Sequence, residues 1–171
     1  MKVVSDAYVS QLVGKYVSDK VGLPITNTPF VGFAIYNSQD EFVAGVVVSN
    51  FRGTDCEVSM AAETPNWARR GVMQTIFDYI FNTAGCVRCT CIVKNARSTR
   101  RTRRFLLGIG FELEGNLKKA YDGTYGALLF GLLRENCRFL KELDVGQENR
   151  TEAAASARSQ CGVGGANQVQ H

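Results

Sequence analysis

The order of helical and β-rich segments constrains the fold of this chain more than any other feature. Apolar residues recur at helical spacing from Asp6 to Val21, and Gly22-Leu23-Pro24 ends that pattern. Three runs of high β propensity follow, at Phe30–Tyr36, Glu41–Asn50 and Cys56–Ala62. A cluster of polar turn residues separates the first two runs. The first part of the chain is therefore predicted to be a helix followed by an antiparallel meander.

The second part alternates between helical and strand patterns. The predicted segments are a helix after Pro65 that Gly85 caps, a buried strand at Cys86–Val93, a very basic helix from Asn95 to about Gly108, and strands at Phe111–Leu117 and Tyr125–Leu133 joined by a hairpin turn at Asp122-Gly123. The order of this part is thus β-α-β-α-β-β, counted from the third strand of the meander.

Composition predicts one globular domain and a tail. The chain has 171 residues, of which 45% are hydrophobic and 21% are charged, and this is typical of a domain that buries a core. Beyond Leu143 there is no Leu, Ile, Phe, Met, Trp or Tyr, so the remaining segment cannot bury enough surface to offset its ordering entropy. We expect a domain at residues 1–143 and a low-complexity tail at residues 144–171, which is a candidate contact for a partner protein.

The sequence indicates a cytoplasmic protein. It has no run of the roughly 18 apolar residues that cross a bilayer, and its first residues do not resemble a signal peptide, so no membrane contact is expected. Its six cysteines lie mostly in apolar runs, which favours reduced thiols without disulfides. Cys86, Cys89 and Cys91 suggest a metal site at first sight. Strand alternation, however, predicts that Cys86 faces away from the other two, and we expect no metal.

The single histidine limits the chemistry. It is His171, the last residue, where a side chain is usually mobile. Catalytic triads, Cys-His pairs and histidine metal sites all need an imidazole that is held rigidly. Catalysis by this chain would therefore use carboxylates, hydroxyls, backbone amides or a cosubstrate.

The segment Trp67–Met73 has the features of an anion site. It lies where the third strand gives way to a helix, and the free N–H groups at a helix start attract phosphate. Gly71 lets the backbone approach a ligand closely, while Arg69 and Arg70 add positive charge.

A second set of motifs lies downstream: Asn95-Ala96-Arg97-Ser98, then Phe105 to Gly115 with Gly110-Phe111 and Glu114-Gly115, then Tyr121-Asp122-Gly123. Together with the loop at Gly71, these motifs resemble the GNAT superfamily of N-acetyltransferases, in particular the branch that acetylates the N-termini of ribosomal proteins and related phage-encoded proteins. The resemblance covers about Phe30 to Leu140. It implies an α+β domain of three α/β layers, in which a mixed, mostly antiparallel central sheet is flanked by helices.

The resemblance also implies an activity, the transfer of an acetyl group from acetyl-CoA to a primary amine of a protein N-terminus or a small molecule, by direct attack in a ternary complex. It implies Glu57 as the general base, with a solvated edge-strand carboxylate as the alternative. Ser98 or Thr102 would hydrogen-bond the leaving sulfur, unless these hydroxyls only bond their own helix. The cofactor-binding residues that it implies are Met60, Ala61, Ala62, Arg69, Arg70, Gly71, Val72, Met73, Asn95 and Arg101. Asn95 is also a candidate helix N-cap.

Two features of the sequence leave open what the basic helix binds and whether the chain is an active enzyme. Five arginines between Arg97 and Arg104 would bind CoA phosphates, form a solvated helix face, or hold nucleic acid or an acidic protein. The chain also departs from the family pattern at Ala68 and Met73, and it has Phe105 and Leu106 where many relatives have a tyrosine acid. The alternative function is therefore a catalytically inactive GNAT-fold structural or interaction protein, such as a phage virion component.

Overall fold

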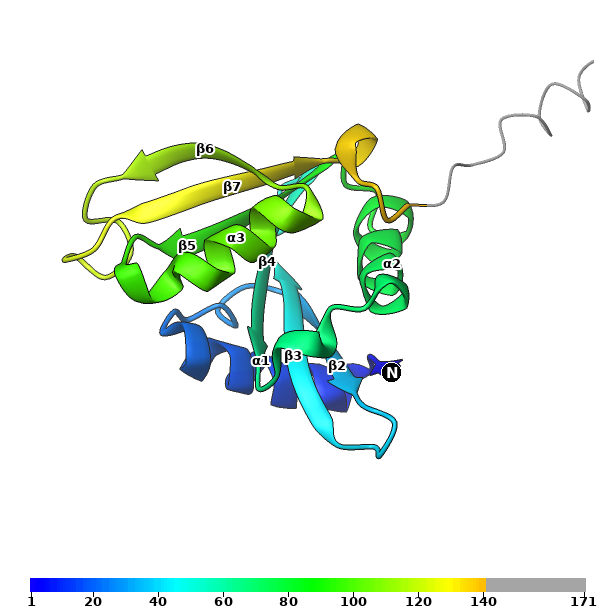
Figure 1. Ribbon diagram of the computed structural model, residues 1–171. Coiled ribbons are helices and arrows are strands. Elements are labelled where there is room, and N and C mark those ends of the chain that lie inside the picture. Colours follow the sequence, from blue (N-terminus) through cyan, green and yellow to red (C-terminus); the bar gives the residue numbers. More distant parts are fainter. Residues whose placement is uncertain (141–171) are drawn as a thin grey trace, which may run out of the picture. The chain divides into compact units, whose positions relative to one another are not determined.

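A computed structural model of the chain describes residues 1–140, which form one compact unit (Figure 1). The predicted boundary at residues 143 and 144, and the predicted tail, lie outside the described residues. The helices and strands are β1 (Lys2–Val4), α1 (Ala7–Val21), β2 (Phe30–Tyr36), β3 (Phe42–Ser49), β4 (Asp55–Ala62), α2 (Arg70–Asp78), β5 (Arg88–Lys94), α3 (Arg100–Ile109), β6 (Glu112–Leu117) and β7 (Ala127–Leu133).

The first helix begins and ends where its sequence indicates. Asp6 is the N-cap of α1, and its side chain accepts a hydrogen bond from the Val9 N–H at 2.8 Å. Gly22 ends the helix in the left-handed conformation at φ 72°, and its N–H donates to the Ser18 carbonyl. The predicted helix from Asp6 to Val21 is confirmed to within one residue.

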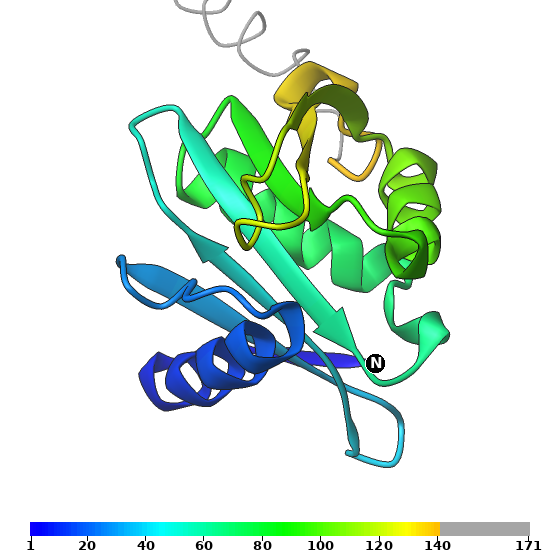
Figure 2. The same ribbon diagram turned by 90° about the vertical axis from the view of Figure 1, so that its left-hand side faces the viewer.

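The seven strands form one sheet in the order β1-β2-β3-β4-β5-β7-β6. Only β4 and β5 are parallel, and every other neighbouring pair is antiparallel. This confirms the predicted mixed, mostly antiparallel sheet. Figure 2 shows the sheet with α1 on one face and with α2 and α3 on the other, which gives three layers.

A separate hydrophobic cluster lies on each face of the sheet. On one face, Val13 and Val17 of α1 pack against Ala34 and Val47. The larger cluster, on the other face, holds the buried side chains of α2 and α3 against the sheet; at its centre, Phe77 stacks on Phe81 with ring centroids 5.9 Å apart. The pattern of apolar residues therefore predicts the inward faces, although it does not predict how the helices are distributed between the two faces.

One strand was not predicted, and two local predictions are wrong. Strand β1 was not expected, because three residues are too few to show strand alternation, and it forms only by pairing with β2. The basic segment is not one helix from Asn95: a 3₁₀ turn at Arg97–Thr99 precedes α3. Asp122-Gly123 is not a tight hairpin turn, since residues 118–126 form a longer loop between β6 and β7.

Gly32 sets the distance between α1 and the sheet. A Cβ atom at this position would lie 2.8 Å from the Ser10 Cα and 3.0 Å from the Ser10 carbonyl oxygen, both of which are backbone atoms. The Ser10 hydroxyl also accepts a hydrogen bond from the Gly32 N–H at 3.0 Å. We therefore expect Gly32→Ala to lower the free energy of unfolding by about 1–3 kcal/mol, because α1 must shift away from β2. Urea denaturation followed by circular dichroism measures this change.

The matched control is Gly108→Ala in α3, where a Cβ atom would meet nothing within 4 Å. Removing a helical glycine there is expected to leave the stability unchanged or to raise it by about 0.5–1 kcal/mol. Equal stabilities of the two variants would show that α1 and β2 do not approach each other closely.

Candidate active site

Strands β4 and β5 pair only over their first residues. The parallel register joins Asp55 to Arg88, Cys56 to Cys89, and Glu57 to Thr90. Beyond these three pairs β4 continues along β3 to Ala62, and β5 continues along β7 to Lys94, so the two strands run apart (Figure 1). Because successive residues of a strand direct their N–H and C=O groups to opposite sides, alternate residues of the diverging parts present backbone groups that no sheet neighbour pairs.

The start of α2 follows directly from the diverging end of β4. A 3₁₀ turn at Pro65–Trp67 connects them, and Arg69 is the N-cap with no side-chain hydrogen bond to the helix. The first N–H that bonds within the helix is that of Met73, which donates to the Arg69 carbonyl at 3.1 Å. The amides of Arg70, Gly71 and Val72 therefore have no carbonyl partner in the helix.

The side chains around these amides leave the site open. A Cβ atom on Gly71 would meet nothing within 4 Å, and Arg69 and Arg70 are exposed. Val72 and Met73 have their side chains in the core, at 3% and 1% exposure, so only their backbone is available to a ligand. The predicted anion site at residues 69–73 thus has free amides, an open glycine and two arginines that no ion pair engages within residues 1–140. The positive end of the helix dipole lies at the same place.

Glu57 lies at the last residue pair before the strands diverge. It is not on an edge strand, because Glu57 pairs with Ser49 on one side and with Thr90 on the other. Its Oε1 accepts hydrogen bonds from the Asn50 side-chain amide at 2.7 Å and from Arg52 at 3.1 Å. Its side chain is 24% exposed. The structure therefore contradicts the alternative of a solvated edge-strand carboxylate.

A network of charged side chains extends from Glu57 across the sheet, and sequence reasoning missed it. Arg52 also pairs with Asp55 at 2.6 Å, and the Thr90 hydroxyl donates to the other Asp55 oxygen at 3.3 Å. The hydrogen bond that Arg52 donates to Asp55 raises the pKa of Arg52. The polar turn between β3 and β4 was a visible signal, but nothing in it indicates which strand residues its side chains would reach.

The same network ends in an ion pair between Arg88 and Glu114. The two side chains make two hydrogen bonds, at 2.6 and 3.0 Å, and the bond to Glu114 raises the pKa of Arg88. Gly131 provides the space for this pair, because a Cβ atom there would lie 2.1 Å from Glu114 Oε1. The pair connects β5 with the edge strand β6 across β7.

Helix α3 contacts the turn that precedes α2 through its Phe105 side chain. The ring of Phe105 packs against that of Trp67, with centroids 5.7 Å apart, and Trp67 is only 5% exposed. Trp67 is thus a packing anchor of the turn before α2. Arg101 precedes Phe105 by four residues and so lies on the same side of α3, which faces the turn before α2.

The other predicted site residues in or near α3 are Ser98, Thr102 and Asn95. Ser98 and Thr102 are exposed, and neither hydroxyl has a hydrogen-bond partner within residues 1–140. The prediction that Asn95 caps the helix is wrong, because Ala96 and Thr99 hold the two N-cap positions. The Asn95 N–H instead donates to the Gly126 carbonyl at 2.8 Å, which ties the end of β5 to the loop before β7.

The β6–β7 loop is fixed by Asp122. This carboxylate accepts hydrogen bonds from the N–H groups of Tyr125 and Thr124 and from Lys94, which together lower its pKa to about 2. Lys94 also lies over the Tyr125 ring, 3.9 Å from its centroid. The Tyr121 hydroxyl donates to the Val21 carbonyl at the end of α1. The loop is therefore anchored to α1 and to the far end of β5.

The five described cysteines are all free thiols in the main core. The prediction that Cys86 faces away from Cys89 and Cys91 is wrong, because β5 begins only at Arg88 and strand alternation does not extend back to Cys86. Burial raises the pKa of Cys56 and of Cys89. Within residues 1–140 no three Cys, His, Asp or Glu side chains are grouped so as to hold a metal ion.

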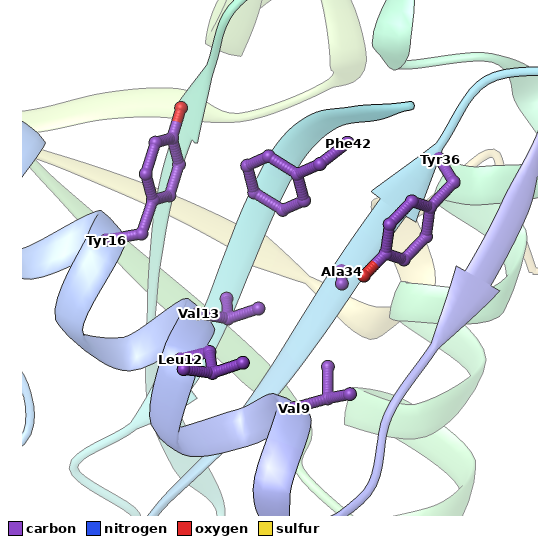
Figure 3. A pocket seen from close by; sticks show the side chains of 7 residues that line it. All are labelled: Val9, Leu12, Val13, Tyr16, Ala34, Tyr36 and Phe42. Carbon is purple, nitrogen blue, oxygen red and sulfur yellow. The ribbon is translucent and has the colours of Figure 1, made fainter. Parts of the chain in front are cut away.

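An apolar pocket of about 260 Å³ lies between α1 and the sheet (Figure 3). Its lining residues are Val9, Leu12, Val13, Tyr16, Ala34, Tyr36 and Phe42. The Tyr16 hydroxyl donates to Glu63 at 2.8 Å, and burial raises the pKa of Tyr16 to about 12. No residue of β4 or β5 lines this pocket, although Ala61 of β4 packs against the same cluster as its lining residues.

None of the described helices combines the length and apolar character that crossing a membrane requires. The structure thus gives no membrane-spanning helix within residues 1–140.

The arrangement of the sheet defines the class of fold. A mixed, mostly antiparallel sheet with helices on both faces is the arrangement that the resemblance implied. The chain has the fold of the GNAT acetyltransferases, as three solved structures show. Comparison with protein-family models and with curated protein sequences finds no match to this chain.

The three structures share the fold at low sequence identity. A single-residue variant of the spermidine N-acetyltransferase from Vibrio cholerae is 13% identical, with a TM-score of 0.59 over 78% of this chain and 95% of that chain. The ribosomal-protein-S5-alanine acetyltransferase from Vibrio fischeri is 16% identical, with a TM-score of 0.53 over 72% of each chain. A GNAT-family acetyltransferase from Bacillus anthracis is 18% identical, with a TM-score of 0.51 over 61% of this chain and 66% of that chain.

Proposed function

We propose that the protein is an N-acetyltransferase that moves an acetyl group from acetyl-CoA to a primary amine. The observation that carries this proposal is the divergence of β4 from β5 next to the unpaired amides of Arg70, Gly71 and Val72. The first feature supplies backbone groups for an extended amide-bearing arm, and the second supplies a diphosphate site. Acetyl-CoA has both parts, at opposite ends of one molecule.

The cofactor would lie along the unpaired side of β4. Its pantetheine amides would pair with backbone groups among Met60, Ala61 and Ala62, where β4 has no partner on the β5 side. Its diphosphate would rest on the amides at Gly71, with the exposed side chains of Arg69 and Arg70 beside it. Arg101 lies on the side of α3 that faces this turn, and we assign it to a cofactor phosphate.

Glu57 is the proton acceptor in this proposal. Its Oε1 is held by Asn50 and Arg52, while no hydrogen bond within residues 1–140 engages Oε2. The amine nitrogen attacks the thioester carbon, a C–N bond forms, and the C–S bond breaks to release the thiolate of CoA. The proton that the amine loses passes to Glu57 directly or through water. Ser98 or Thr102 would donate a hydrogen bond to the departing sulfur.

The class of acceptor that we propose follows from the reaction and from the names of two solved structures that share the fold. The Vibrio cholerae enzyme is named for spermidine, and the Vibrio fischeri enzyme is named for the alanine of a ribosomal protein. Both names point to amine acceptors. We therefore propose a primary amine, either on a small molecule or at a protein N-terminus.

Titration calorimetry with acetyl-CoA tests the proposal. We expect binding with a Kd of about 1–100 μM, since substrates of enzymes commonly bind in the range of typical KM values. Dephospho-CoA and free pantetheine are the matched probes, and pantetheine should bind much more weakly because it lacks the diphosphate. A CoA-release assay with spermidine and with an alanine-initiated peptide then reports turnover. Absence of acetyl-CoA binding at millimolar concentration would overturn the assignment.

A further inference from the structure

Helix α3 presents a basic face that the proposed reaction does not use. The segment from Asn95 to Gly110 contains five arginines and no Asp or Glu. Leu106 and Ile109 are the buried residues of α3 and mark the side that faces the sheet. Arg100, Arg104 and Leu107 follow helical spacing on the opposite side. The arginines at positions 100 and 104 are exposed, and Leu107 on the same side is 56% exposed.

The charges on this face are not neutralised by the rest of the domain. The seven ion pairs within residues 1–140 involve none of the five arginines. No side-chain hydrogen bond of that part of the chain involves them either. By contrast, Arg52 in the turn before β4 and Arg88 on β5 are each paired with carboxylates. The face therefore carries a concentrated positive potential directed to solvent.

The cofactor accounts for only one of these arginines. Arg101 shares a side of α3 with Phe105, which contacts Trp67 just before α2. Arg100 and Arg104 lie on the outward side instead, with the half-buried Arg103 at the edge of that side, so these three residues are not on the side that faces the start of α2. A diphosphate at Gly71 cannot engage both sides of the helix at once.

We propose that the outward face of α3, formed by Arg100, Arg103 and Arg104, binds the phosphate backbone of double-stranded nucleic acid. A helix of ten residues is about 15 Å long, and a duplex presents one negative charge per about 1.7 Å of its axis. Several phosphates therefore fall within reach of the three side chains. Guanidinium groups also match phosphate oxygens bidentately, which favours phosphate over a diffuse acidic surface.

The composition of the face favours a duplex over a single strand. Proteins that hold single strands stack bases on exposed aromatic rings. The only ring on α3 is that of Phe105, and it packs against the buried Trp67. The exposed apolar residue on the face is Leu107, which offers no stacking plane. The contacts available on α3 are thus to the backbone, and binding should depend little on sequence.

Fluorescence anisotropy with a labelled 24-base-pair duplex and the full chain tests this inference. We expect binding at low salt, with an affinity that falls steeply between about 50 and 300 mM KCl. The variant Arg100→Gln/Arg103→Gln/Arg104→Gln should bind about 100-fold more weakly at low salt. Its slope of log Kd against log salt should be smaller by about 2–3, because each phosphate contact contributes about 0.9.

The matched control removes the same charge elsewhere. Lys2, Lys118 and Lys119 are exposed and take part in no ion pair within residues 1–140. The variant Lys2→Gln/Lys118→Gln/Lys119→Gln should keep the slope and lose less than about 3-fold in affinity. Both variants should bind acetyl-CoA like the parent chain, so that failure of this inference is distinguished from failure of the proposed acetyltransferase activity.

Several outcomes would overturn the inference. The first is that about 100 μM protein fails to bind the duplex at 50 mM KCl. The second is that the two triple variants lose the same amount of affinity for the duplex, and the third is that the parent chain binds a single strand of the same length with equal affinity. Polyglutamate that displaces the duplex at equal charge concentration would point to an acidic protein instead. An Arg→Lys triple variant that keeps the salt slope but binds more weakly than the parent would support bidentate phosphate contacts.

Discussion

Glu57→Gln is expected to lower kcat for acetyl transfer by about 10²–10⁴-fold. Glutamine keeps the shape of the side chain, and its amide oxygen can still accept the hydrogen bonds that Asn50 and Arg52 donate at 2.7 and 3.1 Å. It cannot take up the proton that the attacking amine must lose. The Kd for acetyl-CoA should change by less than about 2-fold, because the proposed cofactor contacts lie further along β4 and at α2.

The matched control for this variant is Glu114→Gln. Glu114 is also a carboxylate paired with an arginine, since its oxygens bond to Arg88 at 2.6 and 3.0 Å, but it lies on the edge strand β6. We expect it to lose less than about 5-fold in kcat. Steady-state release of CoA measures kcat, and calorimetry measures the Kd of each variant. Full turnover by Glu57→Gln would remove Glu57 from the reaction.

Local patterns predicted much of this fold because they set where segments begin and end. Asp6 caps α1, and Gly22 and Gly110 end α1 and α3 in the left-handed conformation, all of which depends on neighbouring residues. The free amides at the start of α2 were also predictable, since the start of a helix exposes its own amides whatever lies elsewhere. At the ends of helices, the residues that determine the structure are thus only a few positions apart in the sequence.

The features that sequence reasoning missed depend on residues far apart in the chain. Arg88 and Glu114 are 26 positions apart, and Tyr121 bonds to Val21 across 100 positions. The spacing of residues within one helix or strand does not indicate such pairs. Cys86 shows the same limit in another way, because its side chain joins the cluster of Cys89 and Cys91 through a turn that precedes the strand. A prediction from strand alternation fails where the strand has not yet begun.

The two faces of the sheet differ in how their charges are used. On β4, Asp55 and Glu57 are matched with Arg52, which fixes the geometry around Glu57, while Arg88 on β5 is matched with Glu114 on the edge strand β6. On the helices of the other face, Arg69, Arg70 and the arginines of α3 have no carboxylate partner within residues 1–140. Pairing stabilises a preorganised site, whereas unpaired arginines remain available for phosphates.

Gly71→Asp is expected to weaken acetyl-CoA binding by about 10- to 100-fold without harming the fold. A side chain at this position meets nothing within 4 Å, so Asp can be accommodated. A carboxylate in the first turn of α2 interacts favourably with the helix dipole, and replacing a helical glycine adds to stability, so unfolding should cost about 0.5–1 kcal/mol more. The same carboxylate would lie next to the bound diphosphate and repel it.

Gly71→Asn separates charge from bulk in this experiment. Asn has nearly the same shape as Asp and no charge, so it measures the cost of filling the open space beside the amides. We expect it to weaken binding by less than about 10-fold, and we expect the difference between the two variants to shrink as salt is raised, because screening reduces repulsion. Calorimetry at two salt concentrations gives both affinities. Equal binding by Asp and Asn at low salt would mean that no diphosphate rests on the start of α2, and the cofactor assignment would then have to be withdrawn.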